Sequence, residues 1–251
     1  MAYLDSDINL SQRMTQELGR TIVGRKQGTE SALLTEAELC QQFGVSRSAV
    51  REAVKMLSAK GLVSSRQRQG IRVLPEDQWN IFDPDVLNWF LQREQTLHAV
   101  QEFFQLRIAI EPQAAALAAR YASDEEIQAI EAALDGMKLL PEVTEEALQA
   151  DIAFHVSILY ASKNRFYIRL RDFISTALNV SIRYTGPLKA DHQSVLDDHS
   201  KVFNAIKSRN PERASNAMFL LIDDALATIE AAIEKENHGD VKDSAPKVET
   251  A

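Results

Sequence analysis

Residues 35–57 read TEAELCQQFGVSRSAVREAVKML, and this stretch decides the fold of the first part of the chain. Thr35 and Glu38 form a capping-box pattern, in which a hydroxyl and a carboxylate each bond a backbone amide at the start of a helix. Gly44 can adopt a positive φ and therefore ends that helix. Ser46 then caps a second helix. The stretch predicts two short helices joined by a tight turn.

Both flanks of this stretch extend the pattern. Upstream, apolar residues recur at helical spacing between Leu10 and Lys26, which predicts a further helix. Downstream, two short β-rich runs, residues 62–66 and 71–73, enclose a polar turn that contains Gly70 and predict a hairpin. A helix, a glycine turn, a capped helix and a hairpin are typical of a winged helix-turn-helix, which we expect over residues 1–75.

The second helix of such a fold enters the major groove of DNA by its N-terminal end. Here that end carries Arg47 and Arg51, which lie one turn apart and share a face. An arginine fork can bond guanine O6 and N7 together, so both residues are candidate base readers. The alternative is a solvated charged face. The full set of predicted DNA contacts is Ser46, Arg47, Ser48, Arg51, Arg66, Arg68, Gln69 and Gly70.

The distribution of charge favours a nucleic-acid partner for this part of the chain. The 251 residues carry a net charge of −8, yet residues 1–75 hold 11 basic and 7 acidic side chains, which leaves +4 there and −12 in the rest. Between Ser46 and Leu74, seven basic residues stand against Glu52 alone. A compact basic segment attached to an acidic body is typical of a DNA reader with a separate regulatory part.

Composition excludes several other classes of protein. Cys40 is the one cysteine, so the chain cannot form an internal disulfide, and we expect a reducing compartment. No apolar run reaches the ~20 residues that cross a bilayer, and the N-terminus has no apolar signal core. We therefore expect a cytoplasmic protein without membrane contact, rather than a secreted scaffold, a membrane protein, or a collagen-like or disordered chain.

Beyond Pro75 the sequence is almost entirely helical in pattern. Residues 76–96 are expected to form a linker and linker helix, and residues 97–237 a helical domain for effector binding and dimerisation. Residues 238–251 are polar and without periodicity, which predicts a disordered tail. The predicted fold class is mostly α, with an N-terminal winged helix-turn-helix and a C-terminal all-helical bundle.

Four polar residues in the helical domain are candidates for a binding site. Arg107 lies in a strongly apolar helix, so it either pairs with Glu111, one turn on, or awaits an anionic ligand. Asp151 and His155 stand four residues apart on one helix face, and His199 is a third donor from a different helix. One carboxylate and two imidazoles can hold a divalent metal such as zinc. An ordinary Asp-His hydrogen bond is the alternative.

The N-terminal part resembles the GntR family of bacterial transcription regulators over about residues 10–75. The resemblance rests on residues 34–39, 43–47, 50–53, 57, 61–63 and 70. It implies double-stranded operator DNA as a partner. Ala37 stands where many relatives have a DNA-contacting arginine, which implies an altered operator or greater reliance on Arg47 and Arg51.

The helical domain is similar to the FCD ligand domain of the FadR subfamily over about residues 97–235. In that domain an arginine, an Asp-x-x-x-His pair and two later histidines line an internal cavity, usually around a divalent metal. The first four of these positions are matched here, which implies that effector and metal bind at Arg107, Asp151, His155 and His199. The last histidine falls at Leu221, which cannot coordinate, so the implied metal site is one ligand short.

Residues 78–89 are similar to the equivalent stretch of galactonate-operon repressors, which implies a sugar-acid effector whose carboxylate meets Arg107. We therefore expect a homodimeric repressor, not an enzyme, that releases its operator when the effector binds. Three alternatives stay open. They are a regulator that responds to another small carboxylate, a metal-dependent enzyme tethered to DNA, and a ligand-free dimerisation module in which Arg107 only pairs with Glu111.

Overall fold

The computed structural model describes residues 10–24, 35–66, 70–93, 96–139, 144–185 and 192–237. The chain divides into two compact units between residues 94 and 95, which we call the head (N-terminal) and the body (C-terminal). Two predicted DNA contacts, Arg68 and Gln69, lie outside the described residues, as do the side chain of Arg66 and the tail predicted at residues 238–251.

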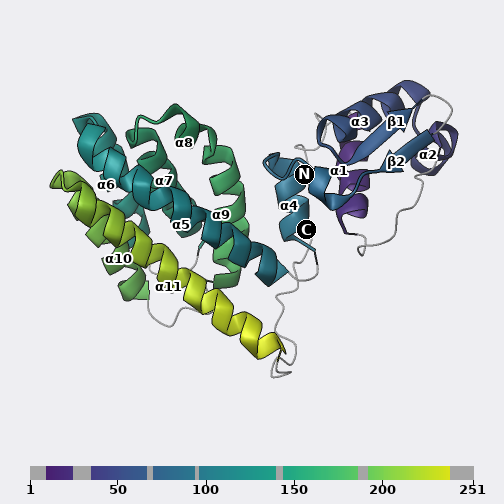
Figure 1. Cartoon of the computed structure of the whole chain (residues 1–251). Coiled ribbons are helices and arrows are strands. Elements are labelled where there is room, and N and C mark those ends of the chain that lie inside the picture. Colours follow the sequence, from purple (N-terminus) through teal and green to yellow (C-terminus); the bar gives the residue numbers. More distant parts are fainter. Residues whose placement is uncertain are drawn as a thin grey trace. The chain divides into compact units, whose positions relative to one another are not determined.

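The head contains the predicted winged helix-turn-helix (Figure 1). Thr35 and Glu38 form the predicted capping box at the start of one helix. Gly44 ends that helix with a φ of 63°, and the Ser46 hydroxyl accepts a hydrogen bond from the backbone of Ala49 at the start of the next. The elements are α1 (Leu10–Val23), α2 (Glu36–Phe43), α3 (Arg47–Ala59) and the antiparallel strands β1 (Val63–Arg66) and β2 (Gly70–Val73).

The core of the head lies between α1, α3 and the hairpin. Apolar side chains spaced three or four residues apart on both helices are buried there, as their periodicity predicts. Each such side chain that leaves water contributes about 1.5–3 kcal/mol to folding. The buried residues include Met14, Leu18 and Ile22 of α1, Val50, Val54 and Leu57 of α3, and Leu62, Val63 and Ile71 around the hairpin.

The linker after the hairpin packs as part of the head. It forms a short 3-10 helix, η1 (Glu76–Gln78), and the helix α4 (Pro84–Leu91). Val86 and Trp89 of α4 are buried in the same core as α1 and α3. Gly61, just after α3, has a φ of 74°, and a β-carbon there would stand 2.4 Å from the Gln78 carbonyl oxygen. The linker can therefore pass this point only if residue 61 is glycine.

Polar contacts also fix α4 against the head. Lys60 Nζ lies 2.7 Å from carboxylate oxygens of both Asp83 and Asp85. The Gln16 amide donates to Asp85 Oδ1 at 2.9 Å and accepts from the indole Nε1 of Trp89 at 3.1 Å. Burial alone would lower the pKa of Lys60, but the two carboxylates outweigh it and raise the pKa. The linker helix is thus held by both apolar packing and paired charges.

The body is a helical bundle. Its two longest helices, α5 and α11, lie side by side (Figure 1). Helix α7 packs against α5 and α6, while α10 packs against α5, α6 and α11. No described helix is both long and apolar enough to span a membrane. The helices are α5 (Thr96–Tyr121), α6 (Asp124–Leu139), α7 (Glu145–Ala161), α8 (Arg165–Arg169), α9 (Arg171–Thr185), α10 (His192–Lys207) and α11 (Pro211–Asn237).

Candidate nucleic-acid interface and candidate metal centre

The exposed start of α3 is the candidate reader of base pairs. Arg47 is the first residue of α3, is exposed, and makes no ion pair with any described residue. Ser46 and Ser48 are also exposed, and their hydroxyl oxygens lie 2.8 Å apart. Arg51 is exposed as well, but its Nε donates to Glu36 Oε2 of α2 at 3.1 Å. Four of the predicted DNA contacts therefore lie at one end of one helix.

The hairpin is the second candidate DNA contact. The backbone of Arg66 in β1 lies opposite that of Gly70 in β2, and Arg72 of β2 is exposed. Gly70 has a φ of 74°, and beyond its chain neighbours no heavy atom of a described residue lies within 4 Å of the place where a β-carbon would stand. Glycine is therefore favoured here by the backbone conformation.

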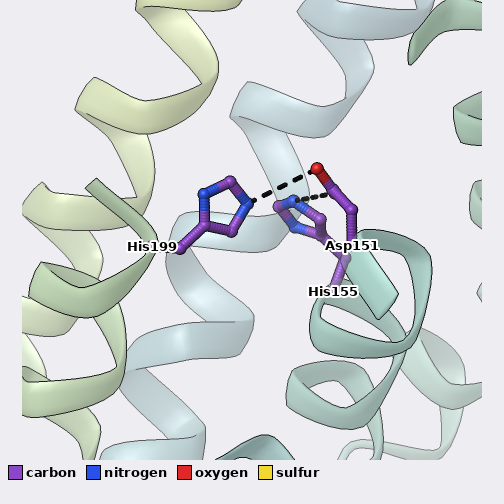
Figure 2. Close-up of side chains that lie close together, drawn as sticks. All are labelled: Asp151, His155 and His199. Atoms are coloured by element: carbon purple, nitrogen blue, oxygen red, sulfur yellow. Dashed lines mark ion pairs between the residues drawn. The ribbon is translucent and has the colours of Figure 1, made fainter. Parts of the chain in front are cut away.

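The candidate metal centre lies in the body, with residues from α7 and α10 (Figure 2). Figure 2 shows Asp151, His155 and His199 close together, and one ligand atom from each lies within 4.8 Å of the other two. His155 Nε2 is 3.4 Å from Asp151 Oδ1, and His199 Nε2 is 3.8 Å from Asp151 Oδ2. Both imidazoles are buried and the aspartate side chain is 17% exposed. The three donors thus converge on one small volume.

Arg107 of α5 borders this centre and is paired with Glu111. Its Nε donates to Glu111 Oε1 at 2.5 Å, and its Nη2 lies 3.2 Å from each ring nitrogen of His155. The pairing matches one of the two alternatives that the sequence left open, yet the same guanidinium also contacts a candidate metal ligand. Burial alone would raise the pKa of Glu111, but Arg107 and His155 outweigh it and lower the pKa to about 2. Glu111 is therefore an anion at neutral pH and balances the charge of Arg107.

Glu111 also orients the ring of His155. Its Oε2 lies 2.6 Å from His155 Nδ1. An ionised carboxylate can only accept, so we assign the ring proton to Nδ1, which leaves a lone pair on Nε2 beside Asp151. Burial lowers the pKa of His155, which favours the neutral ring. Metal-ligating histidines in proteins are held by carboxylates in this way. The sequence pattern indicated only the pairing of Glu111 with Arg107, because the contact with His155 joins two different helices.

His199 has one nitrogen with a partner and one without. Its Nδ1 donates to the Val195 carbonyl at 2.7 Å, so the lone pair of the neutral ring lies on Nε2. This Nε2 is buried and has no hydrogen-bond partner among the described residues. Such an atom costs about 1–3 kcal/mol, which a cation beside it would relieve.

The chemistry of the three donors fits a divalent metal. Burial alone would raise the pKa of Asp151, but His199, His155 and Arg107 outweigh it and hold the pKa well below its ordinary value. The donors are therefore one carboxylate and two imidazoles, a set that suits zinc and similar ions. Leu221 of α11 is 5% exposed and cannot coordinate. Three protein ligands leave positions open for water or an oxygen-bearing ligand.

A winged helix-turn-helix joined to a helical body with a buried polar cluster defines a DNA-binding regulator with a sensing domain. The chain belongs to the GntR family of bacterial regulatory proteins and, through its FCD domain, to the FadR subfamily. Residues 10–73 match the gntR family of bacterial regulatory proteins, and residues 102–224 match the FCD domain. The protein is therefore a DNA-binding transcription regulator with an effector-binding domain, and not an enzyme.

Two curated relatives cover most of the chain. The uncharacterized HTH-type transcriptional regulator YieP of Escherichia coli strain K12 is 35% identical over 216 residues, which are 85% of this chain and 93% of that protein. The galactonate operon transcriptional repressor of the same strain is 31% identical over 217 residues, 86% of this chain and 94% of that protein. Among solved structures, the Listeria monocytogenes protein Lar shares the fold with a TM-score of 0.56 at 19% identity, over 90% of this chain and 99% of that one.

Proposed function

We propose that this protein is a homodimeric repressor that releases its operator when a sugar acid binds in the body. The observation that carries the proposal is the buried Nε2 of His199, which lies beside Asp151 and His155 and has no hydrogen-bond partner in the described part of the chain. This cluster borders a guanidinium, so it offers both oxygen-binding and carboxylate-binding chemistry.

On the DNA side, the exposed start of α3 would enter the major groove. Arg47 and Arg51 would read base edges, and the hydroxyls of Ser46 and Ser48 would bond phosphates. The hairpin would contact the DNA backbone or minor groove through Arg66, Arg68, Gln69 and Gly70. A homodimer would present two copies of α3 to two half-sites about one helical turn apart. Since its target is the chromosome, we place its action in the cytoplasm.

On the effector side, Asp151, His155 and His199 would hold a divalent cation such as zinc. When bound, the cation supplies positive charge and open positions for oxygen ligands. The Arg107 guanidinium would donate to the carboxylate of the effector through Nη1, because Nε and Nη2 already contact Glu111 and His155 whereas Nη1 makes no hydrogen bond with a described residue. Glu111 would hold both Arg107 and His155 in place during binding.

The identity of the effector is the finer part of the proposal. A relative at 31% identity is named a galactonate operon repressor, and the sequence of residues 78–89 points the same way. A regulator that responds to another small carboxylate is the second candidate, because Arg107 and a cation would recognise any carboxylate. Either effector would release DNA only if it bound one arrangement of the dimer more tightly than the other.

A fluorescence-anisotropy experiment on the full chain tests this function. The wild-type protein first selects a duplex from a random-sequence pool, and the labelled duplex is then titrated with galactonate, gluconate, lactate or acetate in the presence of Zn²⁺. We expect a sugar acid to release the duplex at concentrations where acetate has no effect. Release by lactate alone would support the second candidate, and release by none of them would contradict the effector proposal.

Two variants separate the DNA proposal from the effector proposal. Arg47→Ala should weaken binding to the selected duplex by about 1–3 kcal/mol and relax the preference at one base pair. Asp151→Asn should leave DNA binding intact and abolish release by the acid. Equal losses of Arg47→Ala on selected and scrambled duplexes would identify Arg47 as a phosphate contact instead.

A further inference from the structure

A contact between α2 and α3 connects an acidic residue to a predicted base reader. Arg51 Nε donates to Glu36 Oε2 at 3.1 Å, and the two side chains are 67% and 37% exposed. Glu36 is the first residue of α2. Its neighbour Glu38 is already occupied by the capping box with Thr35. Two acidic residues in one helical turn therefore have different partners, and only Glu36 reaches the recognition helix.

The atoms used in this contact leave the terminal edge of Arg51 available. The carboxylate takes the Nε hydrogen, and neither Nη1 nor Nη2 makes a hydrogen bond with a described residue. Those two terminal nitrogens form the edge that can donate to O6 and N7 of one guanine. Arg47 has no comparable carboxylate partner among the described residues.

Energetics argue against a purely structural role for the pair. An exposed ion pair contributes about 0–1 kcal/mol to stability. A carboxylate beside the DNA-binding helix also repels phosphates, which weakens binding to every sequence. A side chain that is ordered before it binds, in contrast, loses less conformational freedom when it meets a base. Glu36 thus lowers general DNA affinity and would improve the discrimination of bases by Arg51.

We propose that Glu36 is a positioning residue that holds Arg51 for base readout and so determines operator specificity. This inference rests on the proposed reading of bases by Arg51. It predicts that loss of Glu36 has opposite effects on two measured quantities. Affinity for scrambled DNA rises, and the ratio of selected to scrambled affinity falls.

The matched control is Glu52, an exposed acidic residue next to Arg51 on α3. It pairs with Lys55 at 3.4 Å rather than with Arg51. Glu36→Ala and Glu52→Ala each remove one negative charge from the helix-turn-helix, but only Glu36→Ala removes the carboxylate from Arg51. Glu36→Gln is a second test variant, because it also removes the charge yet keeps an oxygen that can accept from Nε.

The experiment measures anisotropy of the full chain on the selected duplex, on its single-base variants and on a scrambled duplex. Glu36→Ala should reduce the specificity ratio about threefold to tenfold, which corresponds to the ordering of one long side chain. Glu36→Ala should lose discrimination at the same base pair as Arg51→Ala. In the Arg51→Ala background, the additional change Glu36→Ala should no longer reduce the specificity ratio. Glu52→Ala should change the affinities for the selected and the scrambled duplex by the same factor. Glu36→Gln should restore part of the specificity ratio that Glu36→Ala loses.

Other outcomes overturn the inference in distinguishable ways. If Glu36→Ala and Glu52→Ala have the same specificity ratio, Glu36 acts only through its charge. If the specificity ratio of Glu36→Ala is higher than that of the wild type, Glu36 competes with the base for Arg51. If Arg51→Ala itself discriminates like wild type at every position, the proposed base readout fails and this inference fails with it. Unchanged melting temperatures of the variants exclude misfolding as the cause.

Discussion

The indole ring of Trp89 lies directly on the backbone of Gly19. A β-carbon on Gly19 would stand 2.3 Å from two ring atoms of Trp89, a separation that real side chains do not reach. Gly19 lies inside α1 and Trp89 lies in α4, so the contact joins the linker helix to the first helix of the head. The ring has little room to move away, because Trp89 is 3% exposed and its Nε1 donates a hydrogen bond to the Gln16 side chain.

The first prediction concerns Gly19→Ala. In most helix interiors this change stabilises by about 1 kcal/mol. Here we expect the head to lose about 1–3 kcal/mol of unfolding free energy, since the new methyl overpacks the core against Trp89. Differential scanning calorimetry of the full chain would measure it. Gly136→Ala in α6 is the control, because among the described residues its β-carbon would meet the Ala150 methyl alone, at 3.2 Å, a tight contact that offsets the gain in helix propensity, so stability should change little. Equal stability of both variants would contradict the packing of α4 on α1.

The second prediction concerns Glu111→Gln. An amide has one oxygen where the carboxylate has two, so it cannot present an acceptor to Arg107 at the Oε1 position and to His155 at the Oε2 position at once. We expect the affinity for Zn²⁺ to fall about 10–100-fold, as is usual when a carboxylate behind a metal-binding histidine is removed. Competition with a chromophoric chelator would measure the affinity, and circular dichroism would check the fold.

Its control is Glu131→Gln on α6, which removes an acidic residue that pairs with Lys207 and does not contact the cluster. Glu131→Gln should bind Zn²⁺ like the wild type. If Glu111→Gln also keeps wild-type affinity while folded, Glu111 does not position a metal ligand.

The third prediction concerns coupling between the metal and an anionic effector. Arg107 and Glu111 balance each other, so Asp151 leaves one net negative charge in the buried cluster. A divalent cation bound to neutral imidazoles would make that net charge positive. We expect an acid such as galactonate to bind about 5–150-fold more tightly in the presence of Zn²⁺ than after chelation. Isothermal titration calorimetry would measure both affinities, and equal values would contradict a shared site.

The fourth prediction concerns acid stability of the metal-free body. The pKa of Glu111 is lowered from 4.5 to about 2, so its stabilising effect is complete above about pH 4.5 and is lost as the pH falls toward 2. The lowered pKa of His155 acts in the same direction below about pH 6.5, because protonation favours the unfolded chain. We expect Glu111 alone to contribute on the order of 3 kcal/mol to this loss. Urea unfolding at several pH values would measure it, and Glu111→Gln should flatten the dependence below pH 4.5.

Local sequence signals were sufficient to predict most helix ends. Thr35 and Glu38 cap α2, and Gly44 ends it, because these effects depend on residues a few positions apart. In the body, Asn210 and Pro211 separate α10 from α11 in the same local way, since proline suits the first turn of a helix. The separation of α8 from α9 at Leu170 was not predicted, because no glycine or proline marks it.

The site was predictable to the extent that spacing and family resemblance specify it. Asp151 and His155 share a helix face because they are four residues apart. The approach of His199 from α10 depends on tertiary packing, so the sequence offered His199 as a candidate donor from a different helix and the resemblance supported it. The double role of Glu111 was not predictable from spacing, since its contact with His155 joins α5 to α7.

The burial of Trp89 and Val86 in the head has a consequence for exchanging parts between relatives. A chimaera joined after the hairpin would take α4 from a foreign donor and lose the contact between Trp89 and Gly19. A junction after residue 93 would instead keep α4 together with the α1 and α3 surface on which it packs. Chimaeras of such regulators should therefore fold when joined after residue 93 and be insoluble when joined directly after the hairpin.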